Sequence, residues 1–287
     1  MTRNRVHDAI VDLPPLRDVI ARHGLSARKG LGQHFLLDLN LTAKIARAAC
    51  DLAGGTTIEA GPGPGGLTRA LLLAGAGRVV AVERDARCVE ALQPLVEVSD
   101  GRLEVVAGDA LELDVKTAGA APRRIVANLP YNIATPLLLG WIGQADALES
   151  MTLMFQKEVA ERIVAPVGDA AYGRLSVIAQ WRCTAELAVT VSARAFTPPP
   201  KVDSAVVRLR PHPTPPFDCR RSDLEQVTAA AFGQRRKMLR RSLAGLGVDV
   251  GILLEEAGIG PTLRAESLSV ADFARLARCL NSLREGL

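Results

Sequence analysis

The sequence predicts an α/β fold, in which helices cover both faces of a mostly parallel sheet, followed by a small all-α C-terminal domain. Between residues 56 and 155, short apolar runs alternate with helical patterns, which is typical of βαβ units. A glycine-rich turn follows the first of these runs, as it does in nucleotide-binding βαβ units. The proline-rich stretch 211–216 then separates the alternating region from one that has only helical patterns.

Length and composition agree with one large domain and one small domain. A chain of 287 residues is long for a single domain, and we expect an N-terminal extension at 1–30, the α/β domain at 31–211 and a helical domain at 212–287. A hydrophobic content of 48% with 23% charged residues is ordinary for a soluble globular protein. The net charge of +4 permits nucleic-acid binding without requiring it, so the distribution of the charges matters more than their sum.

The cysteines and the apolar runs limit the kinds of protein that are expected. The five cysteines are scattered without metal-ligand spacing or a disulfide pattern, which favours free thiols in a reducing compartment. No segment reaches the roughly 18 consecutive apolar residues of a membrane span. The N-terminus has acidic residues and lacks the apolar core of a secretory signal. We therefore expect a cytoplasmic protein that contacts no membrane and binds no metal.

The first elements predict one wall of a pocket. A short helix is expected around Leu16–His23, followed by the basic stretch Arg28–Gly30. The stretch Gly32–Asp38 contains hydrogen-bonding side chains and an aromatic residue just before the helical pattern Leu41–Cys50. His34, in this stretch, would by itself more often be an ordinary surface histidine.

A strand, a glycine-rich turn and a helix come next. The strand Thr56–Ala60 enters the turn Gly61–Gly66, where glycines allow close approach of a ligand to the backbone. The helix Leu67–Leu73 follows, and its N-terminus favours a carboxylate or a phosphate. The next strand ends in Glu83, about 20 residues beyond the turn, a position suited to accepting two ribose hydroxyls. The turn alone does not distinguish a dinucleotide from S-adenosylmethionine.

The third and fourth strands also end in polar residues. The strand 103–107 precedes Asp109, which could accept a hydrogen bond from the amino group of a cofactor's adenine. The strand 124–127 precedes Asn128-Leu129-Pro130-Tyr131. The side-chain carbonyl of Asn128 and the backbone carbonyl of Leu129 are two acceptors, and the Tyr131 ring is a surface on which a base could stack. We interpret this stretch as a holder for the exocyclic amine of adenine, although it could also be a turn with a core tyrosine.

Beyond a strand at 152–155 and a helix at 156–164, a proline-rich loop carries a further aromatic residue. Strand-like runs at 175–191 and 202–210 flank this loop. Three consecutive prolines stiffen it, so it could present Phe196 as a fixed, exposed stacking surface. The alternative is a phenylalanine that packs inside the protein.

The region after the proline-rich linker has a helical pattern that continues to Leu243, with further helices around 250–257 and 270–283. Within it, five cations are expected to form one face suited to phosphates, although a solvated surface is the usual meaning of such a run. These cations are Arg235, Arg236, Lys237, Arg240 and Arg241.

With these motifs identified, the sequence resembles the rRNA adenine N6,N6-dimethyltransferase family, and most closely its bacterial small-subunit members. The resemblance extends from Gly30 to the C-terminal helices. It is carried by the motifs at 32–36 (GQHFL), 59–63 (EAGPG), 108–109 (GD), 128–136 (NLPYNIATP), 156–159 (QKEV), 171–177 (AYGRLSV), 196–204 (FTPPPKVDS) and 232–237 (FGQRRK). His34 is a departure, because many members have Asn there.

The resemblance implies a Rossmann-like, S-adenosylmethionine-dependent methyltransferase domain. It implies transfer of four methyl groups to two adjacent adenosines in the hairpin loop near the 3′ end of 16S rRNA, within an immature 30S subunit. We expect the enzyme to act as a monomer. Tyr131 and Phe196 would hold the target base beside Asn128 and Leu129. The implied cofactor contacts are His34, Leu36, Gly61, Glu83, Asp109 and Asn128.

Three other functions compete with this interpretation. A dehydrogenase would need a nicotinamide pocket, which the stretch 128–131 does not supply. A non-catalytic ribosome-assembly factor could share the methyltransferase fold. A methyltransferase of large-subunit rRNA is the nearest enzymatic alternative.

Overall fold

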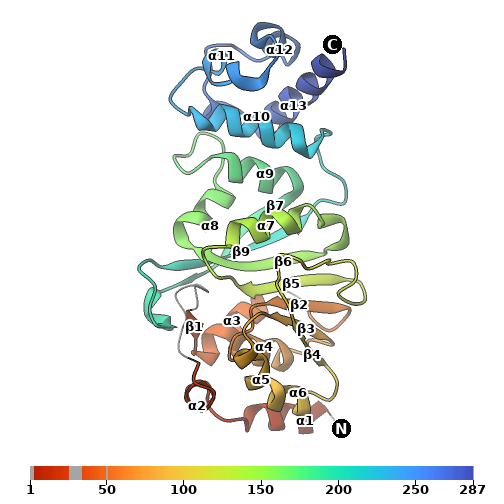
Figure 1. Ribbon diagram of the computed structural model, residues 1–287, viewed down its shortest axis with the longest axis vertical. Helices are drawn as coiled ribbons and strands as arrows, with labels where there is room; N and C mark the ends of the chain where they lie inside the picture. Colours follow the sequence, from red (N-terminus) through yellow and green to blue (C-terminus); the bar gives the residue numbers. More distant parts are fainter. Residues whose placement is uncertain (1–2, 26–33, 50, 287) are drawn as a thin grey trace. The chain divides into compact units, whose positions relative to one another are not determined.

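A computed structural model describes residues 3–25, 34–49 and 51–286 (Figure 1). The expected basic stretch at Arg28–Gly30, Gly32, Gln33 and Cys50 lie outside the described residues. The chain divides into two compact units. The first consists of Met1–Ala160 and Glu186–Pro211, and the second of Glu161–Ala185 and His212–Leu287.

The first unit is built on a seven-stranded sheet. Five of its strands are parallel, and they confirm the five strands expected between residues 56 and 155. Strand β9 confirms the strand expected at 202–210 and is antiparallel to β6. The order is β4 (Leu103–Ala107), β3 (Val79–Glu83), β2 (Thr56–Ala60), β5 (Arg123–Asn128), β6 (Ser150–Gln156), β9 (Ser204–Pro211) and β7 (Cys183–Val191).

The strand order reverses next to β2. The chain runs from β2 through β3 to β4 on one side of it, and returns as β5 and β6 on the other side. Every residue of β2 is buried, which is the expected environment of a central parallel strand. Ligands of open α/β sheets bind at such a reversal, outside the carboxyl ends of the strands. The topology therefore places the expected site after β2 and β5.

Helices connect the parallel strands, and α4, α5 and α6 lie along the part of the sheet formed by β2, β3 and β4 (Figure 1). The helices expected at 41–50, 67–73 and 156–164 are confirmed as α3, α4 and α8. The bounds are α3 (Leu39–Ala48), α4 (Gly66–Leu73), α5 (Ala86–Ala91), α6 (Gln93–Val98), α7 (Ala134–Ile142) and α8 (Lys157–Val164).

The N-terminal residues are part of the first unit. The expected helix around residues 16–23 is confirmed as α2 (Leu16–Arg22), and a further helix, α1 (Arg3–Val11), precedes it. Val6 and Ile10 on α1 are at most 3% exposed and belong to the main hydrophobic core. A two-stranded antiparallel pair joins β1 (Phe35–Leu36) to β8 (Phe196–Thr197).

The prediction of a strand throughout residues 175–191 is wrong for the first half of that range. Residues Arg174–Arg182 form helix α9, and only Cys183–Val191 form strand β7. Most of α9 is buried, including the consecutive residues Ser176–Ala179, so its sequence has no polar face. An apolar run without helical periodicity cannot be distinguished by pattern from a buried strand.

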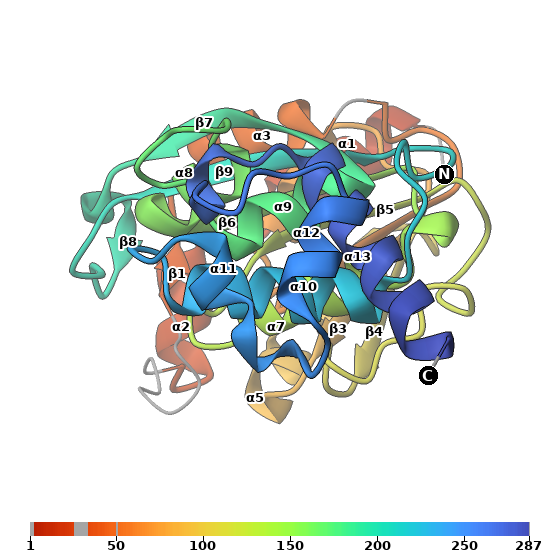
Figure 2. The ribbon, with the colours of Figure 1, turned by 90° about the horizontal axis from the view of Figure 1, so that it is seen from above.

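The second unit is helical. Helices α10 (Arg221–Gly233) and α13 (Val270–Glu285) run side by side (Figures 1 and 2), and they share a core with Tyr172 and Trp181. The hydroxyl of the buried Tyr172 donates to the Leu268 carbonyl at 2.9 Å. The helices expected at 250–257 and 270–283 are confirmed as α12 (Val250–Glu256) and α13.

The helical pattern expected to continue to Leu243 is interrupted. Helix α10 ends at Gly233, and the short helix α11 (Leu239–Ser242) begins only after a turn. Met238, which the helical spacing would bury, is 37% exposed. Arg236 and Lys237 therefore lie in the turn, whereas Arg240 and Arg241 lie on α11, so the expectation that these cations form one face of a continuous helical pattern is wrong.

Two further properties concern the described part of the chain. None of its helices is both long enough and apolar enough to cross a membrane. Its four cysteines are free, and burial raises the pKa of Cys88 and Cys183 to about 12. Thiols with such pKa values stay protonated at neutral pH and are poor nucleophiles.

Candidate active site

A cavity lies at the carboxyl ends of the strands β2, β3, β4 and β5. Its lining residues come from the stretches 34–36, 59–64, 66–67, 82–84, 108–110 and 128–133, together with Leu137. The structure thus brings eight of the nine expected cofactor and base contacts to one cavity. These are His34, Leu36, Gly61, Glu83, Asp109, Asn128, Leu129 and Tyr131.

The glycine-rich turn exposes its backbone to this cavity. Gly61, Gly63 and Gly65 have φ values of 69°, 56° and 90°, a region in which other residues are strained. A Cβ added to Gly61 would meet no protein atom within 4 Å, so the backbone there faces open space. A ligand can therefore approach the peptide groups of the turn directly.

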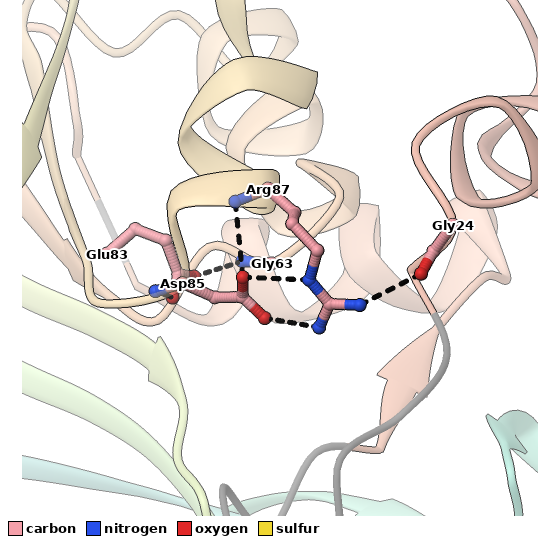
Figure 3. A network of polar contacts seen from close by, with 5 residues as sticks. All are labelled: Gly24, Gly63, Glu83, Asp85 and Arg87. Atoms are coloured by element: carbon pink, nitrogen blue, oxygen red, sulfur yellow. Dashed lines mark hydrogen bonds and ion pairs between the residues drawn. The ribbon is translucent and has the colours of Figure 1, made fainter.

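Glu83 connects the end of β3 to the glycine-rich turn. Its Oε2 accepts the Gly63 N–H at 3.0 Å, and its Oε1 accepts the Asp85 N–H at 2.8 Å (Figure 3). A carboxylate has about four acceptor positions, so these two bonds leave capacity for other donors. Burial raises the pKa of Glu83, whereas the N–H groups of Asp85, Gly63 and Arg84 lower it. The remaining acceptor capacity of this carboxylate suits a ribose hydroxyl.

Asp109 follows β4 and lies at the same edge of the sheet. Its Oδ1 accepts the Leu111 N–H at 3.0 Å, and its Oδ2 forms an ion pair with Arg84 at 3.2 Å. The Arg84 side chain is 71% exposed, and exposed ion pairs contribute only about 0–1 kcal/mol. The aspartate can therefore exchange this partner for an amino group of a ligand at little cost.

Asn128 and Leu129 present two free acceptors. The Nδ2 of Asn128 donates to the His34 carbonyl at 3.3 Å, which directs the amide oxygen away from that bond. Among the described residues, neither this oxygen nor the Leu129 backbone carbonyl has a hydrogen-bond partner. Both residues line the cavity. The pair is suited to accepting the two N–H bonds of an aromatic amine.

Tyr131 is held from two sides. Its hydroxyl lies 2.6 Å from the Ser204 Oγ, and its ring stacks on the His34 ring with centroids 5.6 Å apart. The His34 Nδ1 in turn donates to the Pro198 carbonyl at 2.8 Å. Burial raises the pKa of Tyr131, and the hydrogen bond with Ser204 opposes this rise. His34 therefore has an interaction, the stacking on Tyr131, that was not expected from the sequence.

The expectation of an exposed Phe196 is wrong. The side chain is 3% exposed, belongs to the main core and does not line the cavity. Strand β8 pairs with β1, so that Leu36 and Phe196 are partners, and the core takes up both side chains. The prolines stiffen a loop whose phenylalanine points inward.

Glu59 is a cavity residue to which the sequence assigned no role. It is 1% exposed, and its Oε2 has no hydrogen-bond partner among the described residues. Burial raises its pKa from 4.5 to about 8, the Thr68 hydroxyl lowers it, and the charge of Glu83 raises it further. Its sequence signals were its position two residues before the glycine-rich turn and its place in the motif at 59–63.

The five expected cations of the second unit do not form one uniform face. Arg235 forms an ion pair with Glu266 at 2.9 Å and also donates to the Asp169 carbonyl, so its charge is already compensated. The other four side chains are exposed and form no ion pair within the described part of the chain. They are Arg236, Lys237, Arg240 and Arg241.

These features fit an adenosine-containing cofactor with an aromatic amine beside it. Glu83 has acceptors for ribose hydroxyls, Asp109 has one for an adenine amino group, and the turn at Gly61 admits a ligand to the backbone. The acceptors of Asn128 and Leu129 open on the same cavity. The site thus has separate groups for a nucleoside and for a second, amine-bearing partner.

Comparison with known proteins identifies similar chains. The model of the ribosomal RNA adenine dimethylase family matches residues 24–282. The ribosomal RNA small subunit methyltransferase A of Rhodospirillum rubrum is 59% identical over 94% of this chain and 93% of its own length. The protein of the same name from Paramagnetospirillum magneticum is 60% identical over 95% of this chain and 97% of its own.

Solved structures agree in fold. A dimethyladenosine transferase from Plasmodium falciparum is 27% identical with a TM-score of 0.76, covering 88% of this chain and 98% of that one. The 23S rRNA methyltransferase ErmE is also 27% identical, with a TM-score of 0.65 over 86% of this chain and 99% of its own.

Proposed function

Because this chain belongs to the ribosomal RNA adenine dimethylase family, we propose that it dimethylates N6 of two adjacent adenosines in the 3′-terminal hairpin loop of 16S rRNA. Membership makes the chain a methyltransferase. The identity of 59–60% with small-subunit enzymes, against 27% with a 23S rRNA enzyme, supports a small-subunit substrate. The observation that carries the proposal is the pair of free acceptors on Asn128 and Leu129 in the same cavity as Glu83.

S-adenosylmethionine is the proposed cofactor, and when bound it supplies an electrophilic methyl group on a sulfonium. The residues that would hold it are those of the cavity, with Glu83 at the ribose hydroxyls and Asp109 at the adenine amino group. The remaining proposed contacts are His34, Leu36, Gly61 and Asn128.

Asn128 and Leu129 act on the target adenine. The amino nitrogen of adenine is a weak nucleophile because its lone pair is delocalised into the ring. Accepting its two N–H bonds at the Asn128 Oδ1 and the Leu129 carbonyl favours a pyramidal nitrogen whose lone pair is available. Catalysis of this kind rests on positioning and on preorganised dipoles, so it needs no strong base.

Tyr131 supplies the face on which the flipped base stacks. An adenine leaves its own stack before it can react, at a cost of a few kcal/mol, and an aromatic partner offsets part of that cost. The Ser204 hydroxyl and the His34 ring fix the orientation of Tyr131. Phe196 has no part in this proposal, because its side chain is buried in the core.

The second unit is proposed to bind RNA. Its exposed cations at Arg236, Lys237, Arg240 and Arg241 are suited to phosphate contacts, which carry most of the sequence-independent affinity for nucleic acids. We propose that the substrate is 16S rRNA within an immature 30S subunit and that one copy of the chain acts on it.

Methylation of 30S particles tests the proposed function. The particles are isolated from a strain that lacks the gene, incubated with the purified chain and S-adenosylmethionine, and mapped by primer extension on 16S and 23S rRNA. We expect new stops at two neighbouring adenosines near the 3′ end of 16S rRNA. Stops in 23S rRNA alone would assign the chain to the large subunit, and particle binding without methyl transfer would make it an assembly factor.

A further inference from the structure

The N-terminal residues 3–25 have no part in the proposed chemistry, yet they are built into the first unit. Val6 and Ile10 on α1 are buried in the main core, and α1 contacts both α4 and α6. Val19 and Leu25 form a smaller cluster with Phe35, Cys88 and Ala91. Phe35 itself lines the cofactor cavity, so this cluster reaches the wall of that cavity.

The same segment packs against the far side of the glycine-rich turn. A Cβ added to Gly66 would lie 3.0 Å from the Leu16 Cδ1, so the start of α4 and helix α2 are already in contact. Pro64 lines the cofactor cavity and also a second, smaller cavity of about 60 Å³, whose walls include Leu13 and Val19. The turn therefore has the cofactor site on one side and the N-terminal segment on the other.

A buried arginine fixes the middle of the segment to α4. Arg69 is 6% exposed, and its Nη1 donates to the Pro14 carbonyl at 2.9 Å. Burial lowers the pKa of Arg69, which reflects the cost of holding a charge there. A buried guanidinium bonded to the backbone of residues 3–25 ties that segment to α4, the helix that begins at the glycine-rich turn.

A chain of polar contacts leads from the end of this segment to Glu83, the residue proposed to bind the ribose hydroxyls (Figure 3). Arg87 Nη1 donates to the Gly24 carbonyl at 2.8 Å. Its Nε and Nη2 bind the two carboxylate oxygens of Asp85 at 3.0 and 2.6 Å, in bidentate geometry. The Asp85 N–H donates to the Glu83 Oε1, and the Gly63 N–H donates to the Glu83 Oε2.

Charge gives Arg87 a second effect on Glu83. The Asp85 side chain is only 3% exposed, and its negative charge lies two residues from the buried Glu83. That charge is one of the causes that raise the pKa of Glu83, so it disfavours the ionised form that accepts hydroxyls best. Arg87 neutralises Asp85 and thereby reduces this repulsion.

We propose that residues 3–25 brace the cofactor site, and that Arg87 is the positioning residue that connects this brace, through Asp85, to Glu83. The inference rests on the proposed function in one respect, that S-adenosylmethionine occupies this cavity. Neither Arg87 nor residues 3–25 line the cavity, so Arg87 acts only through its neighbours.

Coupling between the brace and the site is reciprocal. If docking of residues 3–25 favours the binding-competent Glu83, then binding of S-adenosylmethionine must stabilise the docked segment by the same free energy. Amides of residues 16–25 should therefore exchange more slowly with solvent deuterium when the cofactor is bound, although these residues do not touch the cavity.

Calorimetry with S-adenosylmethionine tests Arg87. We expect Arg87→Gln to weaken binding by roughly three- to tenfold, and Arg87→Lys, which keeps the charge without the bidentate geometry, to weaken it less. The matched control is Arg78→Gln, because Arg78 also forms an ion pair, with Glu104 at 2.5 Å, but stands before the opposite end of β3. The control should bind like the wild type, and Glu83→Ala should bind more weakly than any of them.

Hydrogen exchange on the full-length chain completes the test. The expected result is protection of residues 16–25 by the cofactor in the wild type and smaller protection in Arg87→Gln. The brace is overturned if Glu83→Ala weakens binding while Arg87→Gln does not, or if residues 61–66 gain protection while residues 16–25 do not. A wild-type chain that binds no S-adenosylmethionine would contradict the proposed function itself.

Discussion

The free amide oxygen of Asn128 gives the sharpest test of the proposed chemistry. Truncation to Ala keeps the backbone, through which Asn128 would contact the cofactor, and removes the acceptor together with the Nδ2 bond to the His34 carbonyl. Asn128→Ala should therefore bind S-adenosylmethionine nearly normally. Methyl transfer should slow by about 10²–10³, the usual effect of losing one preorganised partner in a transition state. Asn128→Asp keeps an acceptor of the same shape and should retain more activity than Ala. Single-turnover methylation of 30S particles, alongside cofactor titration, measures both, and a wild-type rate for Asn128→Ala would contradict the amine-holding role.

Glu59 should make the stability of the protein depend on pH. Its pKa is raised to about 8 in the folded state, whereas the unfolded carboxyl ionises near 4.5. Between these values the folded state binds more protons, so the free energy of unfolding falls as pH rises, by up to about 1.4 kcal/mol per pH unit. Glu59→Gln has no proton to lose and should flatten this dependence. Urea denaturation across that range compares the two proteins, and parallel curves would show that Glu59 ionises normally.

The sequence was informative wherever a residue's role depends on its place at a strand end. Glu83, Asp109 and Asn128 meet at one cavity because parallel strands end at the same edge of the sheet. Phe196 and Arg235 were not predictable, because their environments are set by residues far away in the sequence. Phe196 is buried by pairing with Leu36, and Arg235 is neutralised by Glu266.

Among the elements, the glycine-rich turn makes the clearest prediction. Gly61 has φ of 69°, and a Cβ would meet no protein atom, so Gly61→Ala should fold with a conformational cost of about 1–2 kcal/mol. The added methyl would project into space that a ligand approaches, and cofactor affinity should fall as well. Gly258→Ala is a matched control, with φ of 63° and equally open surroundings but a position in the second unit, outside the cavity. Equal cofactor affinities in the two variants would remove Gly61 from the binding surface.

Elements with a clear period were predicted, and those set by tertiary contacts were not. The strands β2 to β6 also have a local signal, because each contains a short apolar run bounded by turns, and the sequence located each of them. Helix α9 has no polar face, so periodicity could not identify it. The strands β1 and β8 have two residues each and exist only because they pair with one another, so they leave no local pattern.

For the molecule as a whole, the exposed cations of the second unit should control RNA affinity without affecting the chemistry. Replacing Arg236, Lys237 and Arg240 by Ala should weaken binding to 30S particles. It should also reduce the slope of log affinity against log salt concentration by about 0.7–0.9 for each phosphate that the protein no longer neutralises. Cofactor affinity should stay constant. Replacing Arg220, which already forms an ion pair with Glu285, is the control and should change the salt dependence less. An unchanged salt dependence in the triple variant would make these cations an ordinary solvated surface.

The discontinuity of the second unit affects how the chain can fold during its own synthesis. Tyr172 and Trp181 share a core with α10 and α13, which are translated only after the chain has returned to the first unit to form β9. A ribosome therefore releases these two aromatic residues well before their partners exist. Until then they present an apolar surface of the kind that chaperones recognise. For the same reason, a fragment that begins at His212 would lack part of its own core, and a gene cut there should yield two aggregation-prone products.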